Sequence, residues 1–111
     1  MIAVGINMNF APVADLNTNR FNPIIGRRSF GSDATLVRPI LSAYIKGMQG
    51  AGVLATAKHF PGHGDVSVDS HIEMPLLSSS RARVDALELV PYRAAIEAGV
   101  TAIMPAHIAF P

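Results

Sequence analysis

The sequence contains no cysteine and no tryptophan, and its charges are sparse and balanced. Without cysteine the chain can form neither a disulfide framework nor a thiolate metal site. Nine lysines and arginines stand against eight aspartates and glutamates, and this net charge of +1 indicates no nucleic-acid-binding surface. No apolar run approaches the roughly 20 residues that span a bilayer. We therefore expect neither a nucleic-acid partner nor a membrane span.

What the sequence does contain is a large apolar fraction in a short chain. Half of the 111 residues are hydrophobic and only 15% are charged, which fits one small domain with a buried α/β core. The first five residues lack the basic and long apolar segments of a signal peptide. The composition leaves the cellular compartment undetermined.

Three short apolar runs are spaced along the chain in the manner of β-strands. They cover residues 6–10, 53–58 and 100–106. The first run alternates apolar residues with asparagine, as half-buried strands do, and Pro12 ends it. The second run is uninterrupted and follows Gly52, a pattern typical of a parallel strand buried on both faces.

Helical patterns fill the intervals between these runs. Apolar residues recur with the helical period over 36–48, where Ser32 or Asp33 is a suitable N-cap. Pro39 conflicts with this helix, because an interior proline removes a backbone hydrogen bond. It predicts either a kink or a helix that begins near Arg38.

A polar loop over 59–80 separates the second run from two short helical patterns, 81–88 and 90–98. Pro91 falls in the first turn of the latter, where proline is tolerated. The order β-α-β-loop-α-β predicts parallel strands joined by right-handed crossovers. Three strands are too few to close a (β/α)₈ barrel, which takes about 250 residues.

Polar residues follow the ends of the runs, where α/β folds place their chemistry. They are Asp15, the pair Lys58 and His59, and His107. Lys58 and His59 are either donors for ligand oxygens or a solvent-reaching lysine beside a histidine bonded to backbone. Arg28 is either a bidentate clamp on a ligand or an ordinary surface residue.

The densest polar segment, residues 58–71, holds three of the four histidines, one lysine and two aspartates. Within it, Asp69 and His71 are two residues apart and would point to the same side of an extended loop. Asp69 could then orient His71, raise its basicity and leave its other nitrogen to exchange protons with a substrate. The alternative is that both are ordinary loop residues.

A metal site would use some of the same residues. His63 and Asp65, together with Asp69 and His71, supply two imidazoles and two carboxylates, a sufficient donor set for zinc. Spacing alone does not distinguish this hypothesis from the catalytic one.

The segment KHFPGHGDVSVDSH (58–71) resembles the signature of bacterial β-N-acetylglucosaminidases of glycoside hydrolase family 3. The resemblance extends to NFAPVADL (9–16), IGRRSFGSD (25–33) and EAGVTAIMPAHIAFP (97–111), and so covers nearly the whole chain. It implies an α/β fold, with residues 1–111 as an internal fragment of a (β/α)₈ TIM-type barrel. About three parallel strands with intervening helices, roughly the third to the fifth of that barrel, would belong to this fragment.

The resemblance also implies retaining hydrolysis of terminal β-linked N-acetylglucosamine in a carbohydrate substrate. A loop histidine, here His71, would serve as general acid/base, oriented by Asp69 in place of the usual second carboxylate. Lys58, His59 and Arg28 would bind sugar hydroxyls, and neither metal nor cofactor would be needed. The nucleophilic aspartate would lie beyond residue 111 with the remainder of the barrel, so that the fragment alone is expected to be inactive.

Two alternatives differ from this reading. A family 3 β-glucosidase or β-xylosidase would have another sugar specificity, but such enzymes typically lack the Asp-x-His pair that Asp69 and His71 provide. A non-catalytic sugar-binding module would retain Lys58, His59 and Arg28 without turnover.

Overall fold

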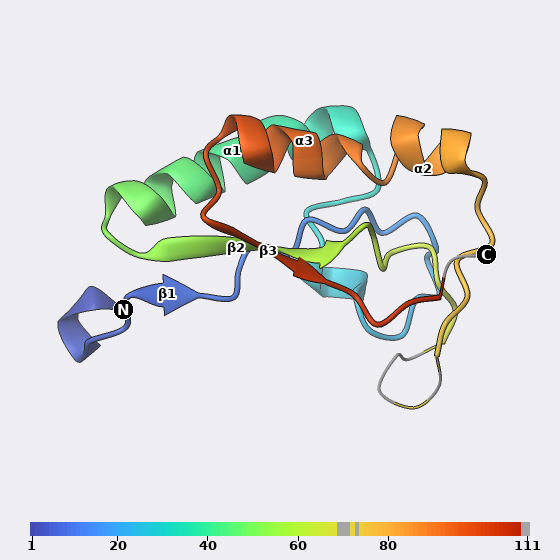
Figure 1. Cartoon of the computed structure of the whole chain (residues 1–111), viewed down its shortest axis with the longest axis horizontal. Coiled ribbons are helices and arrows are strands. Elements are labelled where there is room, and N and C mark those ends of the chain that lie inside the picture. Colours follow the sequence, from blue (N-terminus) through green and yellow to red (C-terminus); the bar gives the residue numbers. More distant parts are fainter. Residues whose placement is uncertain (69–71, 73, 110–111) are drawn as a thin grey trace.

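The computed structural model describes residues 1–68, 72 and 74–109. Short strands alternate with helices in the order that the sequence predicts (Figure 1). The elements are η1 (Ile2–Val4), β1 (Met8–Asn9), η2 (Gly26–Arg28), α1 (Ala34–Gly50), β2 (Leu54–Phe60), α2 (Arg81–Ala86), α3 (Val90–Glu97) and β3 (Ala102–Pro105). The predicted elements are therefore confirmed, although β1 is shorter than the apolar run that indicated it.

The three strands form one parallel sheet in the order β1-β2-β3. Met8 pairs with Leu54 in the register of β1 and β2. Beyond β1 the chain continues alongside β2, where the N–H of Thr56 donates to the carbonyl of Ala11 at 2.8 Å. This topology confirms the predicted α/β class and the parallel strands of a partial barrel.

The helices α1 and α3 pack side by side on one face of the sheet (Figure 1). Along α1, Val37, Leu41 and Ile45 recur every four residues and are buried. They meet Ala55 and Ala57 of β2, whose small side chains allow the helix to lie close. Complete burial of each branched side chain stabilises the fold by about 1.5–3 kcal/mol, so that this row anchors the helix to the sheet.

Pro39 does not shift the start of α1 to Arg38, one of the two predicted outcomes. The helix begins at Ala34, and the Asp33 side chain caps it by accepting from the N–H of Thr35 at 2.8 Å. Pro39 lies inside the helix on its exposed side. Water can therefore reach the Thr35 carbonyl, which proline deprives of its helical partner.

The second face of β2 also differs from the prediction of a strand buried on both sides. Ala55 and Ala57 face the helices and are fully buried, and on the opposite face Thr56 is 2% exposed but Leu54 is 44% exposed. Its register partner Met8 is likewise exposed. The helices α1 and α3 cover one face of the sheet (Figure 1), and on the other face Met8 and Leu54 stay exposed.

We expect the 111-residue chain on its own to be poorly soluble or molten. The apolar face with Met8 and Leu54 is exposed, and so is a second apolar row on α1 with Leu36, Ile40 and Tyr44. Exposed apolar surface and unpaired strand edges favour aggregation. Thermal unfolding and size-exclusion chromatography of the chain would test this, and a sharp cooperative transition from a monomer would contradict it.

Among the described residues, no helix combines the length and the hydropathy that crossing a membrane requires.

Candidate active site

A pocket with charged and imidazole side chains lies at the carboxyl ends of β2 and β3. Its volume is about 390 Å³. Arg28, Lys58 and His59, the three residues predicted to bind sugar, all line it. His63 and His107 add two imidazoles, and the remaining lining is apolar: Ile24, Ile25, Met104, Pro105 and Ala106. The structure therefore brings these predicted residues together, while their role there stays a prediction.

The end of β2 places Lys58 and His59 in this pocket. The sheet register shifts between Lys58 and Phe60, and the Lys58–His59 peptide bond is cis. Partial burial lowers the pKa of the Lys58 ammonium, and the positive charge of Arg28 lowers it further, while Asp15 acts in the opposite direction. Arg28 reaches the pocket from η2, and its guanidinium donates to the Ile24 carbonyl at 3.4 Å. Two cationic donors thus face the same space.

Beneath the pocket, Asp15 is a buried carboxylate that organises the site. Its Oδ2 lies 2.8 Å from Nδ1 of His59, and the backbone N–H of His59 is 3.2 Å from both oxygens. Its Oδ1 accepts from the backbone N–H of His63 at 2.7 Å and from the Tyr92 hydroxyl at 3.2 Å. Asp15 thereby joins the segment after β1, the end of β2 and α3 at one point.

Tyr92 approaches Asp15 from α3, 77 residues away in the sequence. Burial raises the pKa of its hydroxyl well above 10, and the adjacent Asp15 raises it further. The hydroxyl therefore stays protonated and donates a hydrogen bond to Asp15. The Tyr92 ring also packs edge-on against Phe60, with centroids 5.3 Å apart.

The first part of the loop after β2 is pinned by polar contacts from the segment that follows β1. The Asn22 side chain donates to the carbonyls of His63 and Val66 at 2.7 and 3.0 Å. Asp65 accepts from the Thr18 hydroxyl at 3.1 Å and pairs with Arg83 of α2 at 3.1 Å. These contacts fix the loop where it leaves the pocket.

Asp69 and His71, the predicted catalytic pair, lie outside the described residues. The metal hypothesis depends on the same two positions, together with His63 and Asp65. Within the described part of the chain, no three histidine, aspartate or glutamate side chains come together in a way that could hold a metal ion. Both roles therefore stay predictions.

Sequence reasoning placed Asp15 at a strand end but gave it no function. The available signal was its position after the first apolar run, beside the pair Lys58 and His59 in the predicted sheet. Tyr92 and Asn22 were missed, because nothing in the local pattern of a helix or a loop indicates a partner 77 or 41 residues away.

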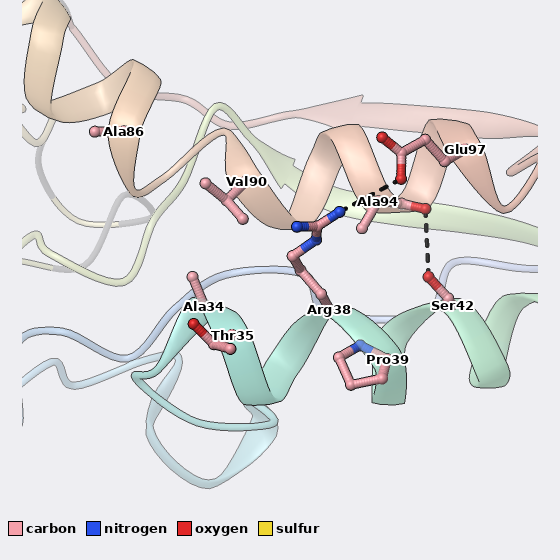
Figure 2. Close-up of a pocket in the computed structure, with 9 residues that line it drawn as sticks. All are labelled: Ala34, Thr35, Arg38, Pro39, Ser42, Ala86, Val90, Ala94 and Glu97. Atoms are coloured by element: carbon pink, nitrogen blue, oxygen red, sulfur yellow. Dashed lines mark hydrogen bonds and ion pairs between the residues drawn. The ribbon is translucent and has the colours of Figure 1, made fainter.

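A second groove, about 480 Å³ in volume, lies between α1 and α3 (Figure 2). The exposed pair Arg38 and Glu97 spans it at 3.6 Å, and the Ser42 hydroxyl donates to the Ala94 carbonyl at 3.5 Å. Among the residues that line it, Arg38 and Glu97 form the one ion pair. The groove therefore lacks the group of donors and acid/base residues that the strand-end pocket provides.

Parallel strands, helices on one face and a pocket with charged and imidazole side chains at the carboxyl ends are the features of part of a (β/α) barrel with its active site. The chain belongs to glycosyl hydrolase family 3: the model of that family's N-terminal domain matches residues 1–111. The family predicted from residues 58–71 is thereby confirmed.

Relatives of this chain include hexosaminidases from several bacteria. A β-hexosaminidase of Tolumonas auensis is 49% identical over 99% of this chain. The family 3 β-N-acetylglucosaminidase of Paenibacillus sp. str. FPU-7 matches with 54% identity and a TM-score of 0.97, over 99% of this chain and 21% of that protein. NagZ of Neisseria gonorrhoeae, solved in complex with N-trifluoroacetyl-D-glucosamine, matches with 38% identity and a TM-score of 0.92. That match covers 99% of this chain and 32% of NagZ.

The chain spans about a third of the length of the Tolumonas relative. NagZ of Neisseria gonorrhoeae has also been solved in complex with zinc ion.

Proposed function

We propose that residues 1–111 form an internal part of a family 3 catalytic barrel, and that the full-length protein is a retaining β-N-acetylhexosaminidase. The observation that carries the proposal is the convergence of Arg28, Lys58 and His59 in one pocket at the strand ends. Hexosaminidases among the relatives support the choice of sugar. The NagZ complex with an N-acylated glucosamine supports a pocket for such a ring.

The proposed chemistry divides between this chain and the rest of the barrel. A carboxylate supplied beyond residue 111 attacks the anomeric carbon, and His71 protonates the leaving oxygen. His71 then removes a proton from the water that releases the sugar, while Asp69 holds its imidazole in one orientation. Arg28 and Lys58 donate hydrogen bonds to ring hydroxyls, which fixes the sugar beside these groups.

The test is hydrolysis of 4-nitrophenyl glycosides by the full-length protein. We expect strong preference for the β-N-acetylglucosaminide over the β-glucoside and the β-xyloside. The first product observed by proton NMR should be the β-anomer, as retention requires. Faster hydrolysis of the β-glucoside or the β-xyloside would indicate a β-glucosidase or a β-xylosidase instead. Sugar binding without turnover would indicate a non-catalytic sugar-binding module.

Replacing Arg28 by alanine is expected to reduce kcat/KM of the full-length protein. A hydrogen bond from a charged donor contributes about 1.5–3 kcal/mol, which corresponds to a reduction of roughly 10- to 100-fold. The matched control is Arg27→Ala, because Arg27 is an exposed neighbour that does not line the pocket. Equal effects of the two substitutions would show that Arg28 does not contact the substrate.

We also expect the full-length protein to work without a bound transition metal. In the proposed chemistry Asp69 is the partner of His71, and no step uses a Lewis acid. Because NagZ has been solved with zinc, zinc is the ion to test. Elemental analysis of the purified protein, combined with activity after chelation, provides the measurement. One equivalent of zinc that is removed together with activity, and restores it when added back, would contradict this expectation.

A further inference from the structure

We propose that Asp15 is a positioning residue that fixes one tautomer of His59, with Tyr92 holding Asp15 in place. In this arrangement His59 carries its proton on Nδ1 and presents Nε2 to the pocket as a hydrogen-bond acceptor. The inference deepens the proposed function and rests on it for the identity of the ligand. The tautomer itself can be measured without any ligand.

The hydrogen-bond partners of Asp15 define the tautomer. A carboxylate only accepts, and its four described polar partners are the backbone N–H groups of His59 and His63, the Tyr92 hydroxyl and Nδ1 of His59. The backbone groups can only donate. At 2.8 Å from Oδ2, Nδ1 of His59 must also donate, so that neutral His59 has its lone pair on Nε2.

Burial strengthens the hydrogen bond between Nδ1 of His59 and Asp15. Asp15 is 1% exposed and Tyr92 2% exposed, so that little water competes with their hydrogen bonds. The phenol of Tyr92 occupies the Oδ1 side, which leaves Oδ2 for the imidazole of His59. The carboxylate is thus held from several directions and cannot rotate away from His59.

The consequence for the pocket is a division of hydrogen-bonding roles. Arg28 and Lys58 supply N–H donors, and the guanidinium has no acceptor at all. With Nε2 of His59 as an acceptor, a sugar hydroxyl can accept from Lys58 or Arg28 while donating its own proton to His59. Neighbouring hydroxyls of a pyranose ring suit such a mixed set better than a site of donors alone.

Asp15→Asn is the sharp test, because it preserves size and changes one hydrogen-bonding role. The new amide NH₂ must face one side of the former carboxylate. On the Oδ1 side the Tyr92 hydroxyl can accept, but the His63 N–H cannot, whereas on the Oδ2 side Nδ1 of His59 can become an acceptor. We therefore expect His59 to change from the Nδ1–H to the Nε2–H tautomer. Nitrogen-15 NMR of the full-length protein labelled at histidine reports this directly, with His59→Gln identifying the signal.

The kinetic readout separates positioning from general damage. With a β-N-acetylglucosaminide as substrate, Asp15→Asn is expected to raise KM roughly tenfold and to change kcat much less, since ground-state contacts are affected. Tyr92→Phe should give a smaller rise in KM with the Nδ1–H tautomer retained. Ile45→Val, a core change in α1 distant from the pocket, is the control for lost stability and should leave KM unchanged.

Each outcome decides the inference. An Nε2–H signal for His59 in the unsubstituted protein at neutral pH would overturn it, whether or not any variant folds. The same holds if Asp15→Asn keeps both the tautomer and KM. If the Nδ1–H tautomer is found but no N-acetylglucosaminide is hydrolysed, the positioning role stands and the proposed function fails.

Discussion

Replacing His71 by alanine in the full-length protein is expected to slow hydrolysis of a glycoside with a poor leaving group by about 10²–10⁴-fold. Such a substrate needs protonation of its leaving oxygen in the first step and an activated water in the second. If His71 supplies both, the variant loses assistance in both steps. Steady-state kinetics with an unactivated disaccharide of N-acetylglucosamine measures this loss.

A substrate with an activated aryl leaving group separates the two steps. Its leaving group departs without protonation, so that the first step should survive in His71→Ala while release of the sugar from the enzyme stays slow. A pre-steady-state burst of the aryl alcohol, followed by slow turnover, is the expected result. Asp69→Asn should show a milder form of the same pattern, because the imidazole remains but loses its charged partner.

Ser70→Ala provides the matched control, since it changes the residue between the two without removing either group. Its kinetics should resemble those of the unsubstituted protein. If His71→Ala released the sugar at the unsubstituted rate, the acid/base role would have to be sought in a carboxylate elsewhere in the barrel.

Much of the fold could be predicted because its determinants are local. The period of Val37, Leu41 and Ile45 indicates the helix that packs on the sheet, and the uninterrupted run at 53–58 indicates the central strand. The predicted start of the helix near Arg38 was wrong for a tertiary reason. The buried row of α1 holds the helix in place, so that one missing hydrogen bond on the exposed side is tolerated.

The candidate site was predictable only in part. Lys58 and His59 stood out because charged and imidazole groups at a strand end are costly to bury without a partner. Arg28 was indicated by the family resemblance of residues 25–33. The hydrogen bonds of Asp15 could not be predicted from the sequence, since they depend on how the segment after β1, the end of β2 and α3 meet in space. Tyr92 in particular looks like an ordinary core aromatic until its hydroxyl is seen 3.2 Å from the carboxylate.

Gly64 shows how closely two of these segments approach each other. A Cβ atom at this position would clash with the backbone carbonyl group of Leu16. Neither side is easily displaced. The carbonyl of Gly64 accepts from the N–H of Asn19 at 3.1 Å, and the carbonyl of His63 accepts from the Asn22 side chain at 2.7 Å. The clash is therefore with backbone that is hydrogen-bonded in place.

Gly64→Ala is consequently expected to destabilise the full-length protein by about 3 kcal/mol or more, the upper range for overpacking in a rigid region. Relief of the clash requires the loop after β2 to move away from residues 16–19, which would also shift His63 and His59 relative to Asp15. We expect a Tm lowered by several degrees together with a large loss of activity. Differential scanning calorimetry and hydrolysis of a β-N-acetylglucosaminide measure the two effects.

The control for this prediction is the same substitution in an open position. Gly47 lies inside α1, and a Cβ there would meet nothing within 4 Å. Alanine is favoured over glycine in a helix, so that Gly47→Ala should stabilise the protein by up to about 1 kcal/mol and leave activity unchanged. Opposite signs for two identical substitutions would trace the damage at Gly64 to its contact with Leu16. A Gly64→Ala protein with unaltered Tm and activity would show that the two segments can separate without cost, and that the contacts around Gly64 do not fix the loop after β2.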